Sequence, residues 1–142
     1  MSSTETYHAS CLCGRVRLAA CPPIQRIGHC HCDNCRRAQG AGVWTWITFK
    51  TEAVDVETGH EDLRQYRSDT DAIRQFCGNC GSSLTFASPR WPGVIDLSLA
   101  NLEEPIDTAP DLHVYADRAP GWCPILDELP RLGGPEGNQP ID

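Results

Sequence analysis

Nine cysteines in a chain of 142 residues constrain this fold more than any other feature, and seven of them fall into three short clusters. The clusters are CLC at 11–13, CHCDNC at 30–35 and CGNC at 77–80. An odd total cannot pair completely into disulfides, and thiols at these spacings are typical of metal sites. We therefore expect the chain to fold around bound metal rather than around a disulfide framework.

The CLC and CGNC motifs together predict a closed zinc site with four thiolate ligands. Side chains alternate along a strand, so Cys11 and Cys13 should point to the same face and reach one ion. Cys77 and Cys80 flank a turn, and the glycine after each of them suits a tight knuckle. Two such pairs, distant in sequence, are typical of a saturated structural zinc centre.

The CHCDNC motif leaves three further thiols, which could bind a second zinc from one local segment. Cys30, Cys32 and Cys35 would supply three ligands and leave one coordination position open, as in catalytic zinc sites. A second structural zinc is the alternative, with His29, His31 or another residue as its fourth ligand. The motif could also share a metal with CGNC, which would leave CLC unused.

The hydrophobic pattern predicts a mainly β fold of short strands. Alternation and flanking turn residues indicate strands over 14–20, 42–49, 71–77, 82–88, 93–102 and 112–117. One short helix is expected over 33–41, with Asp33 or Asn34 as its N-cap and Gly40 near its C-terminus. The length suits one domain over residues 1–132, and the Gly- and Pro-rich residues 133–142 should form a flexible tail.

The charge balance argues against nucleic acid as a partner. The formal net charge is −7 and Lys50 is the only lysine, whereas phosphate-backbone binding requires clustered basic residues. The only short basic run is Arg36-Arg37, which could hold a small anion. The polar start lacks an apolar signal segment, and no apolar run is long enough to cross a membrane, so we expect a cytoplasmic protein.

Several cysteine, tryptophan and histidine side chains that are not among the seven clustered cysteines are expected to have structural rather than catalytic roles. Cys21 and Cys123 are expected to be small buried apolar residues. Trp44 and Trp46 are expected to belong to the core more than to a substrate platform. His31 lies between two candidate ligands and is expected to face solvent or to support the site.

Several motifs, in order, resemble the glutathione-dependent formaldehyde-activating enzyme family of the Gfa or CENP-V type. They are SCLCGRVRL, CHCDNCRRAQGAG, TGHEDLRQYRS, RQFCGNCGSSL and HVYADRAPGW, and the resemblance runs from about residue 8 to residue 130. The resemblance implies a Mss4-like fold of short antiparallel strands, with zinc-binding turns, at most one or two short helices and two zinc ions. It also implies that Cys11, Cys13, Cys77 and Cys80 hold a structural zinc and that Cys30, Cys32 and Cys35 hold a catalytic one.

The activity implied by this resemblance is that of an S-(hydroxymethyl)glutathione synthase, a carbon-sulfur lyase. A thiol such as glutathione would enter the open zinc position and add to formaldehyde or a related small aldehyde. We expect Arg36, Arg37, His31 and Trp46 to be candidate substrate contacts, and a homo-oligomer is compatible with the sequence. The alternatives are a non-catalytic zinc module that binds a protein and, less well supported, a methionine sulfoxide reductase using Cys123.

Overall fold

The computed structural model describes residues 5–141 and shows a mainly β protein, as the sequence predicts. The chain divides into two compact units, each assembled from two separate stretches of sequence. The first unit comprises Met1–Arg26 and Ile47–Asp107, and the second comprises Ile27–Trp46 and Thr108–Asp142. Met1–Thr4 and Asp142, which the predicted domain and tail include, lie outside the described residues.

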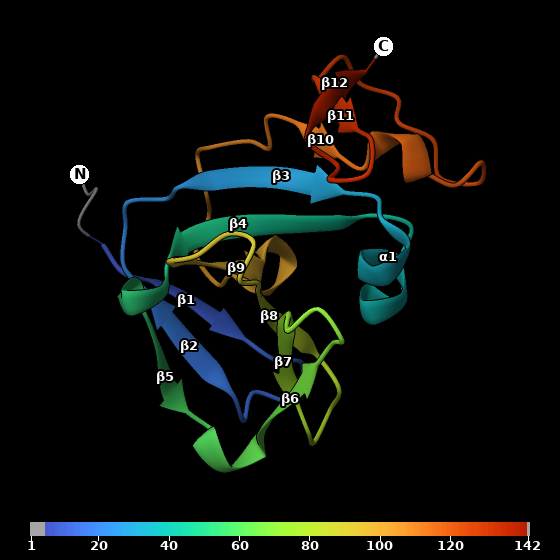
Figure 1. Ribbon diagram of the computed structural model, residues 1–142. Coiled ribbons are helices and arrows are strands. Elements are labelled where there is room, and N and C mark those ends of the chain that lie inside the picture. The colour runs from blue at the N-terminus through green and yellow to red at the C-terminus, as the bar shows by residue number, and fades with distance from the viewer. Residues whose placement is uncertain (1–4, 142) are drawn as a thin grey trace. The chain divides into compact units, whose positions relative to one another are not determined.

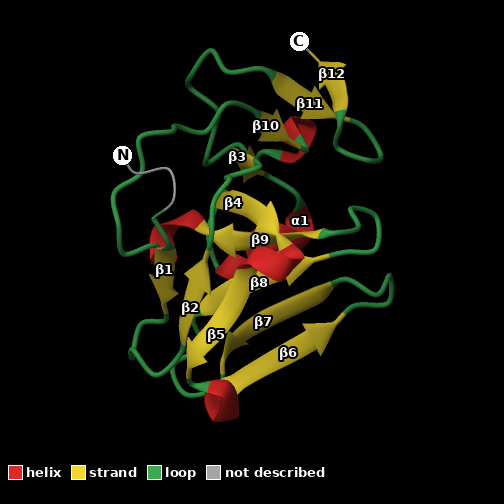
Figure 2. Ribbon diagram, turned by 90° about the vertical axis from the view of Figure 1, so that its left-hand side faces the viewer, coloured by secondary structure: helices red, strands yellow, loops and turns green. Residues whose placement is uncertain are grey.

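A three-stranded antiparallel sheet forms one part of the first unit (Figures 1 and 2). Its strands are β1 (Tyr7–Ser10), β2 (Arg17–Ala20) and β5 (Val54–Thr58), with β2 in the centre. Val16 and Leu18 are almost completely buried, as the alternation of the sequence predicts.

Four further strands of the first unit lie side by side in the order β9, β8, β7 and β6. They are β6 (Leu63–Arg67), β7 (Ile73–Cys77), β8 (Ser83–Ala87) and β9 (Val94–Ser98), and neighbouring strands are antiparallel. The CGNC motif forms the tight connection between β7 and β8. The hairpin therefore carries two clustered cysteines at its tip.

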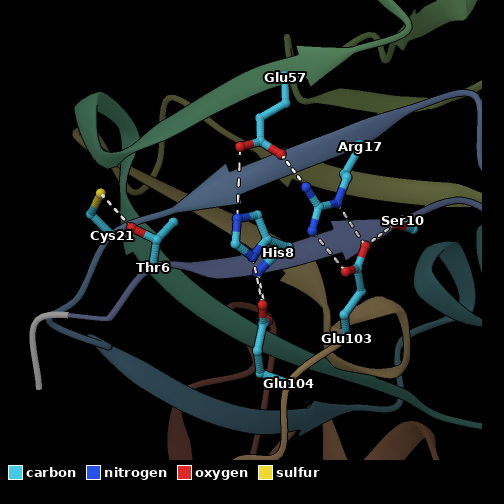
Figure 3. A network of polar contacts seen from close by, with 8 residues as sticks. All are labelled: Thr6, His8, Ser10, Arg17, Cys21, Glu57, Glu103 and Glu104. Carbon is cyan, nitrogen blue, oxygen red and sulfur yellow. Dashed lines mark hydrogen bonds and ion pairs between the residues drawn. The ribbon is translucent and has the colours of Figure 1, made fainter. Parts of the chain in front are cut away.

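A network of ion pairs joins the three-stranded sheet to the segment that follows the 3-10 helix η3 (Leu99–Asn101) (Figure 3). Arg17 donates to both oxygens of Glu103 at 2.9 Å, while His8 Nδ1 lies 2.5 Å from Glu104. The hydrogen bond from Arg17 is the main reason that the pKa of Glu103 falls to about 2. The network thus holds the 102–104 segment against β1 and β2.

The second unit contains the only α-helix of the described residues, α1 (Asp33–Gln39). It also contains short strands in the order β12, β11, β10 and β3, followed by the first residues of β4 (Trp44–Lys50). The strands β3 (Arg26–Cys30), β10 (His113–Val114) and β11 (Arg131–Gly133) pair in parallel, so the expectation of antiparallel strands is wrong for these three. Strand β12 (Gln139–Ile141) is antiparallel to β11. Part of the expected tail is therefore a strand.

The tryptophans of β4 contribute to the core, which is the interpretation the sequence favoured. Trp44 and Trp46 are both buried, and the Trp46 ring packs so closely on Gly28 that a Cβ there would lie 2.8 Å from it. The next residues of β4, Ile47 and Phe49, are fully buried. Strand β4 is thus apolar on both faces, as expected for a strand without a solvent face.

Some connections contain short 3-10 helices, and one of these shortens a predicted strand. The expected strand over 112–117 contains only His113 and Val114. Tyr115 adopts a left-handed φ of 51°, and the 3-10 helix η4 (Ala116–Arg118) follows it. The others are η1 (Thr51–Ala53) and η2 (His60–Asp62). Residues 5–141 contain no helix long and apolar enough to span a bilayer.

Candidate metal centres

The first unit brings the four cysteines of CLC and CGNC together. The sulfurs of Cys11, Cys13, Cys77 and Cys80 all lie within 4.8 Å of one another. Cys11 Sγ lies 3.6 Å from Cys13 Sγ, which in turn lies 3.8 Å from Cys77 Sγ. This is the grouping that the motif spacing predicts, and its sulfur donor set fits a tetrahedral zinc site.

Backbone and side-chain donors surround these four sulfurs. Val16 N donates to Cys11 Sγ at 3.3 Å, and Cys13 N donates to Cys80 Sγ at 3.4 Å. The hydrogen bond with the Ser82 side chain is the largest cause that lowers the pKa of Cys80, to about 5. Burial raises the pKa of Cys77 to about 11. The N–H of Cys13 favours the thiolate form of Cys80, which is the form that binds metal.

The second unit brings the remaining clustered cysteines together. Cys30 ends β3, Cys32 precedes α1, and Cys35 lies in the first turn of that helix. Their three sulfurs also lie within 4.8 Å of one another. Among residues 5–141, no fourth cysteine, histidine or carboxylate atom joins this group. The cluster therefore offers three protein ligands to one ion.

The start of α1 explains the local geometry of this cluster. Cys32 is the N-cap, and its sulfur accepts a hydrogen bond from Cys35 N at 3.2 Å. The prediction of Asp33 or Asn34 as N-cap was wrong, because the sulfur of Cys32 already occupies the capping position. Gly40 closes the helix in a left-handed conformation, as predicted.

Without a nearby cation, the surroundings of the three-cysteine cluster favour the protonated thiol of Cys30. Hydrogen bonds that the Cys30 thiol makes with Cys32 and Cys35, followed by burial, raise the pKa of Cys30 far above its ordinary value. Such crowding of buried sulfurs disfavours thiolates, whereas a bound cation reverses the preference. The donor set therefore suits a thiolate-binding metal.

Three histidines and an aspartate lie on the other side of β3. His29 and His31 both contact His113, with ring centroids 4.9 Å apart in each pair. Because side chains alternate along an extended chain, the intervening Cys30 faces away from this group. The sequence motifs assign no role to His113 or Asp127. The parallel pairing of β3 with β10 brings His113 here, and Asp127 joins the group through its contact with His113.

The candidate substrate contacts differ in their surroundings. His31 is buried and faces His113. Trp46 is buried against Gly28. Arg36 donates through Nε to the carbonyl of His31 at 3.1 Å and through Nη2 to Asp33 at 2.5 Å. Arg37 is exposed and makes no hydrogen bond or ion pair within residues 5–141.

The two isolated cysteines lie outside both clusters. Cys21 is exposed, with its sulfur 3.8 Å from Thr6 Oγ1 (Figure 3), so the prediction that it is buried was wrong. It lies at the end of β2, where the chain leaves the sheet. Cys123 is partly buried and packs against Gly42.

Comparisons with known proteins agree with this arrangement. The family model for the glutathione-dependent formaldehyde-activating enzyme matches residues 6–118. A Halomonas elongata protein, provisionally named as such an enzyme, is 27% identical over 123 residues, covering 82% of this chain and 78% of its own. An uncharacterized lyase of Schizosaccharomyces pombe is 31% identical over 84 residues, 57% of each chain.

A solved structure has a similar fold. The crystal structure of a Rhodobacter sphaeroides protein matches with a TM-score of 0.60 and 25% identity. The match covers 70% of this chain and 91% of that one. The family model spans most of the chain and includes all seven clustered cysteines. The chain therefore belongs to the glutathione-dependent formaldehyde-activating enzyme family.

Proposed function

We propose that this protein is a zinc-dependent carbon-sulfur lyase of the S-(hydroxymethyl)glutathione synthase type. The observation that carries the proposal is the three-cysteine cluster, which no fourth protein donor completes among residues 5–141. Catalytic zinc sites retain an open position of this kind, whereas structural sites are closed. The four-cysteine cluster is then the structural site, and the chain holds two zinc ions.

The reaction joins two small molecules without any oxidant or reductant. The thiol sulfur bonds to the carbonyl carbon of formaldehyde, the carbonyl π bond breaks, and the carbonyl oxygen takes the proton. A Zn²⁺ ion held by Cys30, Cys32 and Cys35 would keep an incoming thiol deprotonated and positioned. These three thiolates carry one more negative charge than Zn²⁺ neutralises. The residues therefore favour activation of a thiol over acidification of water.

The arginines of α1 take different parts in this proposal. Arg36 stabilises the cysteine segment, because its guanidinium binds the carbonyl of His31 and the carboxylate of Asp33. Arg37 is exposed, lies two residues after Cys35 in α1 and is available to a ligand. Glutathione carries carboxylates, which guanidinium groups bind well. We therefore assign carboxylate binding to Arg37 and structural support to Arg36.

Replacing one ligand of the open site tests the function. Serine is a favoured N-cap, so Cys32→Ser should preserve α1 while removing a metal ligand. We expect one of two zinc equivalents to be lost and thiol-dependent formaldehyde consumption to fall to the spontaneous rate. The assay is exchange of ¹³C-formaldehyde with glutathione, followed by NMR.

Cys123→Ser is the matched control, because Cys123 belongs to neither cluster. It should retain both metals and full activity. Full activity in Cys32→Ser with the second metal absent would contradict the proposal. Two zinc ions per chain with no acceleration by the wild-type protein would instead favour a non-catalytic zinc module.

A further inference from the structure

A series of hydrogen bonds connects Asp127, in the 119–130 segment, to His31, which lies between the candidate metal ligands Cys30 and Cys32. Asp127 accepts from His113 Nε2 at 2.9 Å, and His113 Nδ1 lies 2.8 Å from His31 Nε2. Both histidines are buried, with exposed fractions of 3% for His31 and 4% for His113. Leu129 N donates to Asp127 Oδ1 at 3.0 Å and fixes the carboxylate.

The carboxylate of Asp127 orients the hydrogen bonds that link Asp127, His113 and His31. The pKa of Asp127 is lowered, mainly by the hydrogen bond from His113, so Asp127 is an acceptor only. A neutral His113 then carries its proton on Nε2 and accepts at Nδ1. His31 in turn donates from Nε2, and its Nδ1 carries no proton. That Nδ1 is buried and has no hydrogen-bond partner among residues 5–141.

His31 is held from three directions as a result. Its side chain is held by His113, its backbone N–H donates to Val114 O at 3.1 Å, and its carbonyl accepts from Arg36 Nε. Its chain neighbours are Cys30 and Cys32, so the position of His31 determines the backbone path between two sulfurs.

We propose that Asp127 is a positioning residue of the three-cysteine site, which through His113 fixes His31 as its Nε2–H tautomer and so fixes the backbone that carries Cys30 and Cys32. The inference rests on the proposed function in taking this cluster as a metal site. Supporting groups of this kind commonly change metal affinity by about 10- to 100-fold when removed. Asp127 therefore couples the 119–130 segment to the metal-binding loop.

The first test reads the tautomers directly in the zinc-loaded protein. Correlations between the imidazole nitrogens and carbon-bound protons distinguish the two tautomers of each histidine. We expect His31 and His113 to carry the proton on Nε2, and Asp127→Ala to convert both to tautomer mixtures. A proton on His31 Nδ1 in the wild-type protein would overturn the proposal, whether or not any variant folds.

The second test measures zinc release to a chelator from the same protein. Glu128→Ala is the matched control, because it removes an adjacent, exposed acidic side chain for which the structure shows no partner. We expect Asp127→Ala to release one of two zinc equivalents about 10-fold faster than wild type, with the other unchanged. Glu128→Ala should match wild type. Equal release from both variants would contradict the inference.

These outcomes are separable from those that test the function. Tautomers and zinc release are measured without substrate. A protein with the expected tautomers and release rates but no glutathione-dependent activity would refute the proposed function and leave the positioning role intact. Normal catalysis by Asp127→Ala with unchanged release would refute the positioning role alone.

Discussion

At the scale of single residues, adjacent side chains of the same type have different surroundings. Arg36 is partly buried and bound to the cysteine segment, whereas Arg37 is exposed. The sequence offers both as equivalent cations in one short run. Only the fold distinguishes the arginine that supports the loop from the one that remains available to a ligand.

Alanine at each position should separate these roles. Arg37→Ala removes a charge-assisted hydrogen bond to a carboxylate, so KM for glutathione should rise about 10-fold. KM for 2-mercaptoethanol, which has no carboxylate, should not change. Arg36→Ala should instead weaken zinc retention and lower activity with both thiols. An unchanged KM for glutathione in Arg37→Ala would contradict carboxylate binding there.

The cysteine clusters were predictable from sequence because their spacing alone limits which sulfurs can share an ion. Both groups of close sulfurs agree with the predicted division into four and three. The contribution of His113 and Asp127 was not predictable in this way. It depends on the two-residue parallel pairing of β3 with β10, which lie about 80 residues apart in the sequence. Local sequence patterns do not indicate such a distant pairing.

At the scale of elements, most strands that the sequence predicts are present, because local apolar patterns and the turn residues that bound them indicate strands. Strands β2, β7, β8 and β9 and helix α1 fall within their predicted ranges. Strand β3, with sequence RIGHC, was missed because it has little alternation and one glycine. The polar strand β6 was missed because most of its side chains face solvent, so burial left little pattern in its sequence.

The turn after β5 depends on a glycine for two separate reasons. Gly59 has a φ of +87°, and a Cβ there would lie 2.2 Å from the carbonyl oxygen of Arg15. Gly93 has a nearly identical φ of +84° but open space around it. Comparing substitutions at Gly59 and Gly93 therefore distinguishes the cost of a left-handed backbone from the cost of a steric clash.

Alanine at the two glycines should destabilise the protein unequally. Gly93→Ala should lower the free energy of unfolding by about 1 kcal/mol, the usual cost of a left-handed alanine. Gly59→Ala adds a clash with backbone and should cost about 2 kcal/mol more. Urea unfolding of the zinc-loaded variants measures both. Equal losses would show that the close approach to Arg15 is relieved without cost.

At the scale of the whole molecule, each compact unit contains one cysteine cluster. The four-cysteine cluster joins residues 64 positions apart within the first unit, since Cys13 and Cys77 lie side by side. Metal binding at such a site contributes directly to folding free energy. The three-cysteine cluster comes from six consecutive residues and constrains the chain much less. In the proposed function, zinc therefore stabilises the fold in one unit and supports the chemistry in the other.

The most direct test of this account is metal analysis combined with glutathione titration of the cobalt-substituted protein. We predict two metal ions per chain, with glutathione changing the visible absorption of one Co²⁺ and leaving the other unaffected. Cys32→Ser should abolish the responsive signal alone. One metal per chain, or two metals that both ignore glutathione, would contradict the assignment of an open thiol-binding site.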